Sequence, residues 1–368
     1  MLPTPIAMLE ADANSPMRVL FITRTYPPLV GGMETFASNF YTNFRKLERI
    51  DLLANPGGLK TLAQFFLRAL VFIFLNPRAY DVIHLYDAVL SPLIPGIRLF
   101  SNARISLTVN GLDVAYRPLG YQKLIPFFLK KADRVIAISE YTRSQCAARG
   151  ISTERLTVIP VGIDTSRIEG CAPGVKADTA SRYGIDVGRK KILLTVGRLV
   201  RRKGHAWFIS QVLSKLPSDY VYVIAGSGPE KEHLASLARG LDMGSRVKLI
   251  GSVSDEERDC LYELAHLFVI PNITVPGDQE GFGIVALEAG LRGLTVIASD
   301  IEGLRDAVVE GETGSLIREQ DPRAFLAAVV NPPQLDPATI RQSVVSRFAW
   351  TVIAGRYHEE FQQLRAAK

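Results

Sequence analysis

Short apolar runs that alternate with helical stretches constrain the fold of this chain most strongly. Each half of the sequence holds five such runs, of five to seven residues each. Continuous apolar runs are typical of parallel strands that helices cover on both faces. The predicted strands are residues 18–23, 81–85, 104–109, 134–139 and 156–160, then 191–197, 220–226, 246–251, 267–271 and 294–299. The pattern therefore predicts an α/β protein with two open parallel sheets in tandem, facing each other across a cleft.

The length of the chain agrees with two domains, because 368 residues exceed one ordinary hydrophobic core. Residues 164–179 separate the two sets of strands, and their Gly, Pro and polar composition without a clear period predicts a linker. We predict an N-terminal Rossmann-like domain at 1–165, with a loose leader at 1–16, and a C-terminal Rossmann-like domain at 166–346. Ligands of such sheets bind at the carboxyl ends of the strands.

Composition and charge narrow the class of partner. Hydrophobic residues make up 47% and charged residues 22%, which favours a globular protein over a disordered one. A net charge of +6 indicates an anionic partner: nucleic acid, a phosphorylated substrate or a membrane surface. No basic motif interleaved with aromatic residues is present, so a nucleic-acid partner is not predicted. The N-terminus does not resemble a signal peptide, because Glu10 and Asp12 interrupt its brief apolar stretch.

The cysteines suggest the compartment. Cys146, Cys171 and Cys260 are odd in number and widely spaced, which matches neither a disulfide framework nor a metal site. We therefore predict a reducing compartment, the cytoplasm, and no bound metal.

An intensely apolar segment lies at residues 62–75. It has 14 residues and contains Arg68, whereas a spanning helix needs about 20 apolar residues. Two interpretations stay open: a buried helix, or a helix that lies in the interface of a bilayer. Lys123, Lys130, Lys131 and Arg134 add positive charge to the same half. Peripheral contact with anionic lipid on the inner face of the membrane is one hypothesis, and ordinary salt-bridged surface lysines are the other.

Two glycines follow the first predicted strand. Gly31 and Gly32 precede a helical pattern that begins near Glu34. A strand, a glycine turn and a helix N-terminus expose backbone N–H groups and the positive end of a helix dipole, which together bind anions. The glycines do not form the GxGxxG fingerprint, so a dinucleotide is disfavoured. A plain tight turn is the alternative.

Two cations follow the first strand of the second half. Arg198 and Lys203 come directly after residues 191–197, where both can reach one cluster of phosphates. Arg offers a planar fork of donors to phosphate oxygens, and Lys offers a point charge. Arg201 and Arg202 are interpreted as solvated surface. A further strand end precedes Ser254, a plausible cap of the next helix.

The stretch EGFGIVALE, residues 280–288, places an acid at each end of an apolar run. Gly281 and Gly283 keep the backbone bare, so Glu280 is predicted in a loop, and a helix is predicted from Ile284. The N–H groups at the start of that helix suit a phosphate. Carboxylates are poor phosphate ligands but good acceptors for sugar hydroxyls, so Glu288 is predicted to hold a ribose and Glu280 a second sugar. A surface helix with incidental acids is the alternative.

These motifs resemble those of the retaining, nucleotide-sugar-dependent glycosyltransferases of the GT-B fold, specifically glycosyltransferase family 4. The resemblance covers nearly the whole chain, and the E-x7-E stretch at 280–288 is its most specific element. It is accompanied by GRLVRRKG at 197–204, the Gly31 and Gly32 turn, and the segments at 132–142 and 158–164. Residues 347–368 resemble the last helix of this fold, which crosses back to the N-terminal domain.

The resemblance implies a role for each matched residue. Arg198 and Lys203 would neutralise a diphosphate where other transferases use a metal, so no metal or other cofactor is expected. The donor would be a nucleoside-diphosphate sugar with UDP or GDP, and the acceptor a saccharide or a lipid-linked saccharide bound by the N-terminal domain. Glu288 would bind the ribose, Glu280 the donor sugar, and Gly32 the diphosphate. The donor loop and helix start would supply the remaining contacts through Gly281, Phe282, Gly283, Ile284 and Val285.

One position departs from the family. Members commonly carry a histidine where this chain has Asn110, and that histidine helps to bind the donor sugar near the reacting carbon. Asn donates and accepts hydrogen bonds but does not change charge near neutral pH. Asp113 and Tyr116 follow Asn110 and are candidates for the acceptor side, and His84 is a weaker one. The implied function is transfer of a sugar to an acceptor hydroxyl in polysaccharide or lipopolysaccharide synthesis. The alternatives are a nucleotide-sugar-binding pseudoenzyme and a GT-B nucleotide-sugar epimerase.

Overall fold

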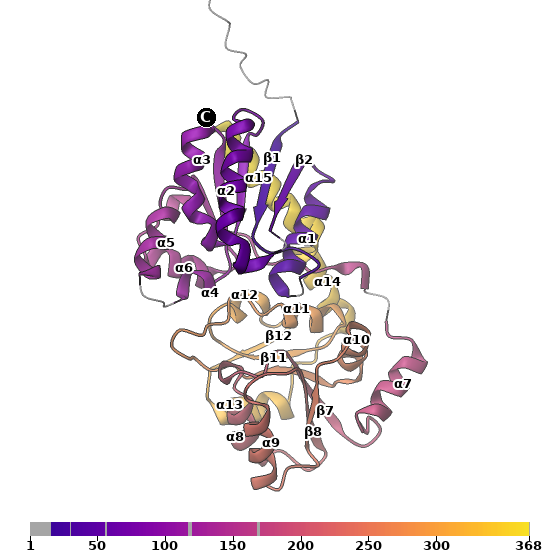
Figure 1. Ribbon diagram of the computed structural model, residues 1–368. Coiled ribbons are helices and arrows are strands. Elements are labelled where there is room, and N and C mark those ends of the chain that lie inside the picture. The colour runs from indigo at the N-terminus through magenta and orange to yellow at the C-terminus, as the bar shows by residue number, and fades with distance from the viewer. Residues whose placement is uncertain (1–15, 30, 56, 117–119, 168–169, 368) are drawn as a thin grey trace, which may run out of the picture. The chain divides into compact units, whose positions relative to one another are not determined.

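Two six-stranded sheets organise the chain in a computed structural model that describes residues 16–29, 31–55, 57–116, 120–167 and 170–367. Figure 1 shows the helices and strands in order along the chain. The predicted leader falls outside the described residues, apart from residue 16. The chain forms two compact units: Met1–Thr108, Lys131–Val135 and Ala354–Lys368 in the first, and Val109–Lys130 and Ile136–Ile353 in the second.

The first sheet has the strand order β2-β1-β3-β4-β5-β6. Its strands are β1 (Arg18–Thr23), β2 (Arg49–Ala54), β3 (Val82–Tyr86), β4 (Arg104–Val109), β5 (Arg134–Ala137) and β6 (Leu156–Val158). The helices among them are α1 (Gly32–Phe44), α2 (Leu62–Leu75), α3 (Ile94–Phe100), α4 (Leu112–Ala115), α5 (Tyr121–Leu129) and α6 (Glu140–Ala148). Strand β1 pairs in parallel with β2 and with β3, as continuous apolar strands predict.

The end of the last helix, α15 (Trp350–Ala366), completes the core of the first sheet. Tyr357 lies 4.9 Å from Phe40 of α1, measured between ring centroids. Its hydroxyl also forms a 2.9 Å hydrogen bond with Thr108 at the end of β4. Figure 1 shows α1 and α15 together on one side of β1, and α2 and α3 together on the other. Residues near the end of the sequence are therefore part of the core that its beginning forms.

The second sheet has the order β12-β11-β10-β7-β8-β9. Its strands are β7 (Lys191–Val196), β8 (Tyr220–Ala225), β9 (Val247–Gly251), β10 (Leu267–Ile270), β11 (Val296–Ser299) and β12 (Gly314–Ile317). The helices are α7 (Pro173–Arg182), α8 (His205–Gln211), α9 (Lys231–Gly240), α10 (Asp255–Leu264), α11 (Ile284–Leu291), α12 (Leu304–Ala307), α13 (Pro322–Val330) and α14 (Pro337–Phe348). All described strand pairs of this sheet are parallel.

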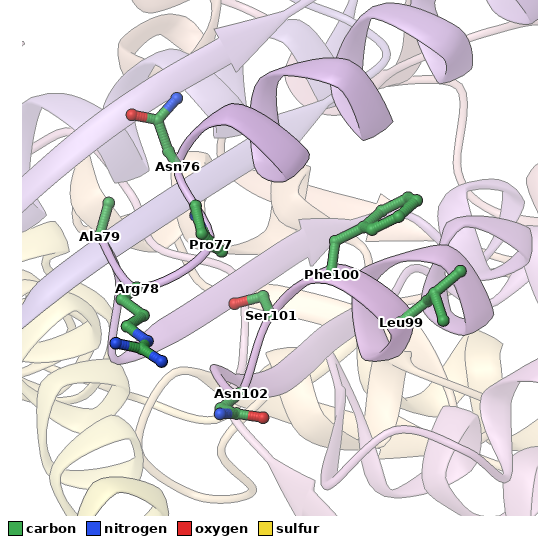
Figure 2. Close-up of a pocket in the computed structure, with 8 residues that line it drawn as sticks. All are labelled: Asn76, Pro77, Arg78, Ala79, Leu99, Phe100, Ser101 and Asn102. Carbon is green, nitrogen blue, oxygen red and sulfur yellow. The ribbon is translucent and has the colours of Figure 1, made fainter. Parts of the chain in front are cut away.

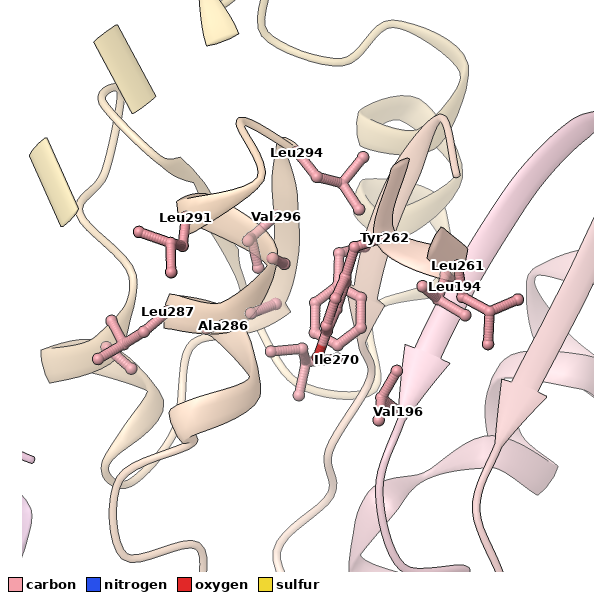
Figure 3. Packing of buried hydrophobic residues seen from close by; sticks show 14 of the residues in the cluster. Leu194, Val196, Leu261, Tyr262, Ile270, Ala286, Leu287, Leu291, Leu294 and Val296 are labelled. Atoms are coloured by element: carbon pink, nitrogen blue, oxygen red, sulfur yellow. The ribbon is translucent and has the colours of Figure 1, made fainter. Parts of the chain in front are cut away.

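Successive residues of β7 point into two separate cores. Leu194 packs with Tyr262 of α10 and Leu287 of α11, a cluster that Figure 3 shows around the Tyr262 ring. Leu193 packs on the opposite face with Phe208 of α8 and Phe325 of α13. Because side chains alternate along a strand, a sheet covered on both faces needs apolar residues at every position. The continuous apolar runs of the sequence meet that need.

The linker prediction missed a helix. Residues 164–179 contain most of α7, which begins at Pro173 and packs on α10. Proline suits the first turn of a helix because its missing N–H would have no partner there. Helix α7 is mostly polar, so its apolar period is too weak to distinguish it from a loop by sequence.

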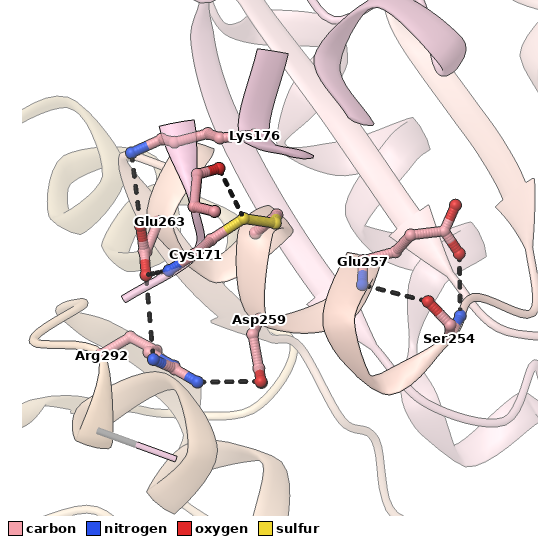
Figure 4. Close-up of a disulfide and its surroundings, with 9 residues drawn as sticks. Cys171, Lys176, Ser254, Glu257, Asp259, Glu263 and Arg292 are labelled. Atoms are coloured by element: carbon pink, nitrogen blue, oxygen red, sulfur yellow. Dashed lines mark hydrogen bonds and ion pairs between the residues drawn. A yellow bond between two sulfur atoms is a disulfide. The ribbon is translucent and has the colours of Figure 1, made fainter. Parts of the chain in front are cut away.

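The cysteine prediction was wrong. Cys171 and Cys260 form a disulfide, with their Cα atoms 5.2 Å apart and a sequence separation of 89. Packing of α7 on α10 brings the two cysteines together, and spacing alone could not reveal this contact. Figure 4 shows the bridge beside Glu263. The Glu263 carboxylate accepts a hydrogen bond from the Cys171 N–H at 2.7 Å and forms an ion pair with Lys176 at 3.5 Å. Cysteine spacing therefore no longer supports a reducing compartment.

Helix α2 has a buried face and an exposed one. Phe65, Ala69 and Ile73 are buried, whereas the side chains of Leu67 and Leu75 are 66% and 69% exposed. The buried face agrees with the first sequence interpretation, and contact of the exposed face with a bilayer stays a prediction. Within the described ranges, no helix combines the length and apolar character needed to cross a bilayer.

Candidate active site

The second sheet offers a binding edge at the carboxyl ends of β7 and β10. These strands are neighbours, but the chain continues from β7 towards β8 and from β10 towards β11, in opposite directions along the sheet. Ligands of open α/β sheets bind outside the carboxyl ends of the strands at such a switch point. The segment with Arg198 and Lys203 follows β7, and the loop that leads to Glu280 follows β10. The topology therefore places both predicted motifs at one edge.

Lys203 and Glu280 meet at this edge. Lys203 ends a short 3-10 turn (Arg201–Lys203), and its Nζ donates to Glu280 Oε2 at 2.5 Å. Asn272, two residues after β10, donates to the same oxygen at 3.0 Å. Burial would raise the pKa of Glu280, but the positive charges of Lys203 and Arg202 outweigh it and lower the pKa to about 2. Glu280 is therefore a carboxylate at neutral pH, and the lysine keeps further N–H donors for another acceptor.

Arg202 corrects the sequence analysis, which interpreted it as solvated surface. Its side chain is only 15% exposed. The guanidinium donates to Glu280 at 2.5 Å and to Asp278 at 2.9 Å. The 3-10 turn directs Arg202 and Lys203 to the same acid, a local geometry that the run of basic letters does not reveal. Arg201 and Arg198 are exposed, and Arg198 lies two residues past the end of β7.

The glycines of the loop at residues 280–283, which leads into α11, are required by close packing. Gly283 has φ +93°, and a Cβ there would lie 2.5 Å from the side chain of Leu304. A Cβ on Gly281 would lie 2.6 Å from the carbonyl oxygen of Asn110. Phe282 between them is buried. Helix α11 begins at Ile284, where the sequence predicted it, so the N–H groups of Ile284 and Val285 lie in its first turn.

Glu288 lies one turn into α11 and is held by α10. It accepts a hydrogen bond from the Tyr262 hydroxyl at 2.8 Å, and Arg258 Nε lies 3.6 Å from it. Burial raises the pKa of Glu288, and the charge of Arg258 opposes that rise. The sequence analysis missed both partners, although their spacing of four residues places them on one face of α10. The predicted cap at Ser254 is confirmed, because Ser254 and Glu257 form a capping box that begins this helix.

The loop after β4 also contacts the loop at residues 280–283. Asp113 accepts the Asn110 N–H with both carboxylate oxygens, at 2.8 and 3.0 Å, which fixes the turn. Ser139, the cap of α6, donates to the Gly281 carbonyl at 2.8 Å. Tyr116 is 59% exposed and packs edge-on against Tyr121. The structure thus brings Asn110 beside Gly281, and Asp113 acts on the backbone of Asn110.

His84 lies in the core of the first compact unit. Its ring nitrogens lie 3.2 Å from the hydroxyls of Ser106 and Thr108, and its ring packs on Phe21. Burial lowers its pKa to about 3, so the ring is neutral at physiological pH. The side chain has no exposed surface for an acceptor, and these contacts give His84 a structural role. In the same unit, Gly31 caps helix α1 and Gly32 begins it, and a Cβ on Gly32 would meet no atom within 4 Å.

Glu302 is a site residue that the sequence analysis missed. It follows β11, is only 9% exposed, and accepts the backbone N–H of Glu280 at 2.5 Å. Burial raises its pKa to about 7. Its φ of +47° is one that residues other than glycine seldom adopt. No sequence pattern predicted that a residue 22 positions after Glu280 would hold its backbone.

Comparison with known proteins finds a glycosyltransferase family match in each half of the chain. The sequence profile described as Glycosyltransferase Family 4 matches residues 10–167, and the one described as Glycosyl transferases group 1 matches residues 181–330. A GDP-mannose-dependent alpha-(1-6)-phosphatidylinositol monomannoside mannosyltransferase of Mycobacterium tuberculosis is 26% identical, over 92% of this chain and 96% of the relative. The alpha-maltose-1-phosphate synthase of Mycolicibacterium smegmatis is also 26% identical, over 95% of this chain and 100% of the relative.

Solved structures share the fold. Anabaena HepE in complex with UDP superposes with a TM-score of 0.76 at 17% identity, over 94% of this chain and 100% of HepE. The lipopolysaccharide outer core galactosyltransferase WaaB superposes with a TM-score of 0.69 at 18% identity, over 93% of this chain and 98% of WaaB. With its two doubly wound sheets and these relatives, the protein is an enzyme, a nucleotide-sugar-dependent glycosyltransferase of the GT-B fold. Within that class, the chain belongs to glycosyltransferase family 4.

Proposed function

We propose that this enzyme transfers a sugar from a nucleoside-diphosphate donor to a hydroxyl of a lipid-linked or membrane-surface saccharide, with retention of configuration and without a metal. The observation that carries the proposal is the edge of the second sheet, where Lys203 and Arg198 follow β7 and two acids bracket the start of α11. Mannose on GDP is the first donor to test, because it is the donor of the mycobacterial relative.

The chemistry of the site supports this donor class. Lys203 and Arg198 supply positive charge where a leaving diphosphate becomes more negative, which lowers the barrier without a Lewis acid. Glu280 and Glu288 supply acceptors for hydroxyls on either side of the phosphates. The resemblance of EGFGIVALE to the E-x7-E motif of retaining family members is the basis for proposing retention. Asn110 and Tyr116 are proposed to face the sugar and the acceptor, respectively.

The donor proposal predicts a thermal shift that depends on the base. We expect one nucleotide family among GDP, UDP and ADP and their common sugar conjugates to raise the melting temperature. A ligand that binds only the folded state stabilises it by about 2.7 kcal/mol at a concentration of 100 Kd. The shift should be equal in magnesium and in EDTA. Loss of the shift in EDTA would contradict metal independence, and no shift with any nucleotide would remove the main support for the donor site.

The exposed face of α2 and α3 supports a membrane-surface acceptor. Leu67, Phe74 and Leu75 of α2 and Leu99 of α3 are 59–76% exposed, and the Phe74 ring lies 5.3 Å from Phe100. The two helices contain Arg68 and Arg98 but no acidic residue. Figure 2 shows the pocket at their C-terminal ends, which is lined by Asn76, Pro77, Arg78, Ala79, Leu99, Phe100, Ser101 and Asn102. Exposed apolar side chains beside the exposed Arg68 suit an anionic bilayer surface, whereas Arg98 is paired with Asp133 at 2.6 Å.

The membrane proposal predicts that the double variant Phe74→Gln/Leu75→Gln binds anionic vesicles at least about tenfold more weakly than the wild type, because each side chain loses its apolar transfer energy. Co-sedimentation with phosphatidylglycerol vesicles at low salt measures the change. Leu241→Gln is the matched control, because Leu241 is also exposed but belongs to the second compact unit. Equal binding by the wild type and the double variant would reject this face as the contact.

A further inference from the structure

We propose that Glu302 positions the donor sugar by holding the peptide of Glu280 in place, an inference that rests on the proposed donor site. Glu302 itself does not touch the donor in this proposal. It fixes the backbone of the residue whose carboxylate accepts hydroxyls of the transferred sugar. Its effect should therefore appear in recognition of the sugar and not in recognition of the nucleotide.

The turn after β11 contacts Glu280 on both sides of its backbone. The Glu280 N–H donates to Glu302 Oε2 at 2.5 Å, and the Glu280 carbonyl accepts the Gly303 N–H at 3.1 Å. A Cβ on Gly303 would lie 2.1 Å from the carbonyl oxygen of Gly281, so the two loops pack backbone against backbone. Two hydrogen bonds on one residue leave its backbone little rotational freedom. The carboxylate of Glu280 is then aimed at Lys203 and Asn272.

Glu302 keeps this contact at two energetic costs. Its φ of +47° would suit glycine, and its carboxyl group is buried beside the like charge of Glu280. Arg202 offsets part of that charge, Glu319 adds to it, and burial raises the pKa of Glu302 to about 7. A strained, buried acid persists where the surrounding structure needs it, and such residues concentrate at functional sites. Glycine would remove both costs here, but it would leave the Glu280 N–H without its acceptor.

The chain provides a matched control for the backbone effect. Asp242, between α9 and β9, also has a positive φ, at +55°, but it is exposed. Asp242→Gly relieves the same kind of backbone strain far from the donor loop in sequence. Comparison of Asp242→Gly with Glu302→Gly therefore separates relief of strain from loss of the Glu280 contact.

The experiment measures ligand binding by calorimetry. The ligands are GDP, GDP-mannose, UDP and UDP-glucose, and the proteins are the wild type, Glu302→Gly, Glu302→Gln and Asp242→Gly. We expect Glu302→Gly to bind the free nucleotide within twofold of the wild type and the matching nucleotide sugar about tenfold more weakly, as loss of one hydrogen bond to a site residue implies. Glu302→Gln keeps an oxygen acceptor and should retain sugar affinity. Asp242→Gly should change neither affinity.

The outcomes separate this inference from the proposed function. If Glu302→Gly binds nucleotide sugar as the wild type does, or loses sugar and free nucleotide equally, the positioning role is wrong. If Glu302→Gln loses as much sugar affinity as Glu302→Gly, the accepting oxygen is not the cause and the inference also fails. If the wild type binds none of the four nucleotides, the proposed donor site itself fails. Melting temperatures of all variants establish that each is folded.

Discussion

Lys203→Ala should lower kcat/KM by about 10²–10³-fold, the loss typical of removing one preorganised donor from a developing oxyanion. Lys203 is buried at the end of the 3-10 turn that follows β7, and no other ammonium group is paired with Glu280 among the described residues. Without it, Arg198 is the remaining cation proposed to contact the leaving diphosphate, because Arg202 is paired with Glu280 and Asp278. Initial rates at varied donor concentration measure the change, and we expect most of it in kcat, because the interaction strengthens as the phosphate leaves.

The neighbouring Arg201 provides the control for Lys203. Arg201→Ala removes the same unit charge two residues away, but Arg201 is exposed. We expect it to keep activity within about twofold, since exposed charges contribute little. Lys203→Ala should still fold, because Arg202 continues to pair with Glu280 at 2.5 Å. A folded Lys203→Ala enzyme with a wild-type rate would reject the proposed role of Lys203 in stabilising the leaving group.

Glu288→Gln should weaken donor binding by about 10–100-fold, because hydrogen bonds to a charged acceptor are worth about 1.5–3 kcal/mol. Glutamine keeps the shape of the side chain and an acceptor for the Tyr262 hydroxyl, so α10 and α11 should stay packed. It loses the negative charge and one of the two oxygens that can hold a ribose diol. Calorimetry with the nucleoside diphosphate identified by thermal shift measures the loss.

Inorganic pyrophosphate separates the ribose role of Glu288 from a general electrostatic effect. Pyrophosphate has no ribose, so Glu288→Gln should not weaken its binding. Glu256→Gln makes the same charge change at an exposed position of α10 and should leave both affinities unchanged. Equal loss of nucleotide and pyrophosphate affinity in Glu288→Gln would contradict the ribose assignment.

Most strands of the two sheets were predicted from the sequence because a buried parallel strand is a continuous run of apolar residues. Strands β1 and β4 have the predicted bounds. The missed strands, β2 and β12, lie at the edges of their sheets. Strand β2 has an exposed Arg49 and Asp51, and β12 is only four residues long. Edge strands bury less surface, so their sequences contain fewer of the apolar residues on which the prediction depends.

The candidate site was predictable where its residues follow strand ends or belong to the stretch at 280–288. Lys203, Glu280 and the start of α11 are of this kind, since topology alone places them together. Arg202 was misjudged because its burial depends on a 3-10 turn that aims it at a distant acid. Glu302 was missed because its contact with Glu280 is made between two loops, and no period or spacing links such positions.

Helix α10 contains both a cysteine of the disulfide and the side chains that contact Glu288. Cys260, which is bonded to Cys171, lies between Arg258 and Tyr262, and both of these side chains contact Glu288. A thiol reductant that converts the bridge to two thiols would remove the covalent link between this helix and the segment before α7, leaving the Cys171 N–H bond to Glu263 and the packing of α7. Donor affinities measured with and without reductant would then describe two covalent forms of the enzyme. The two forms differ in the cross-link on α10, the helix that contacts Glu288, and Glu288 is proposed to hold the ribose.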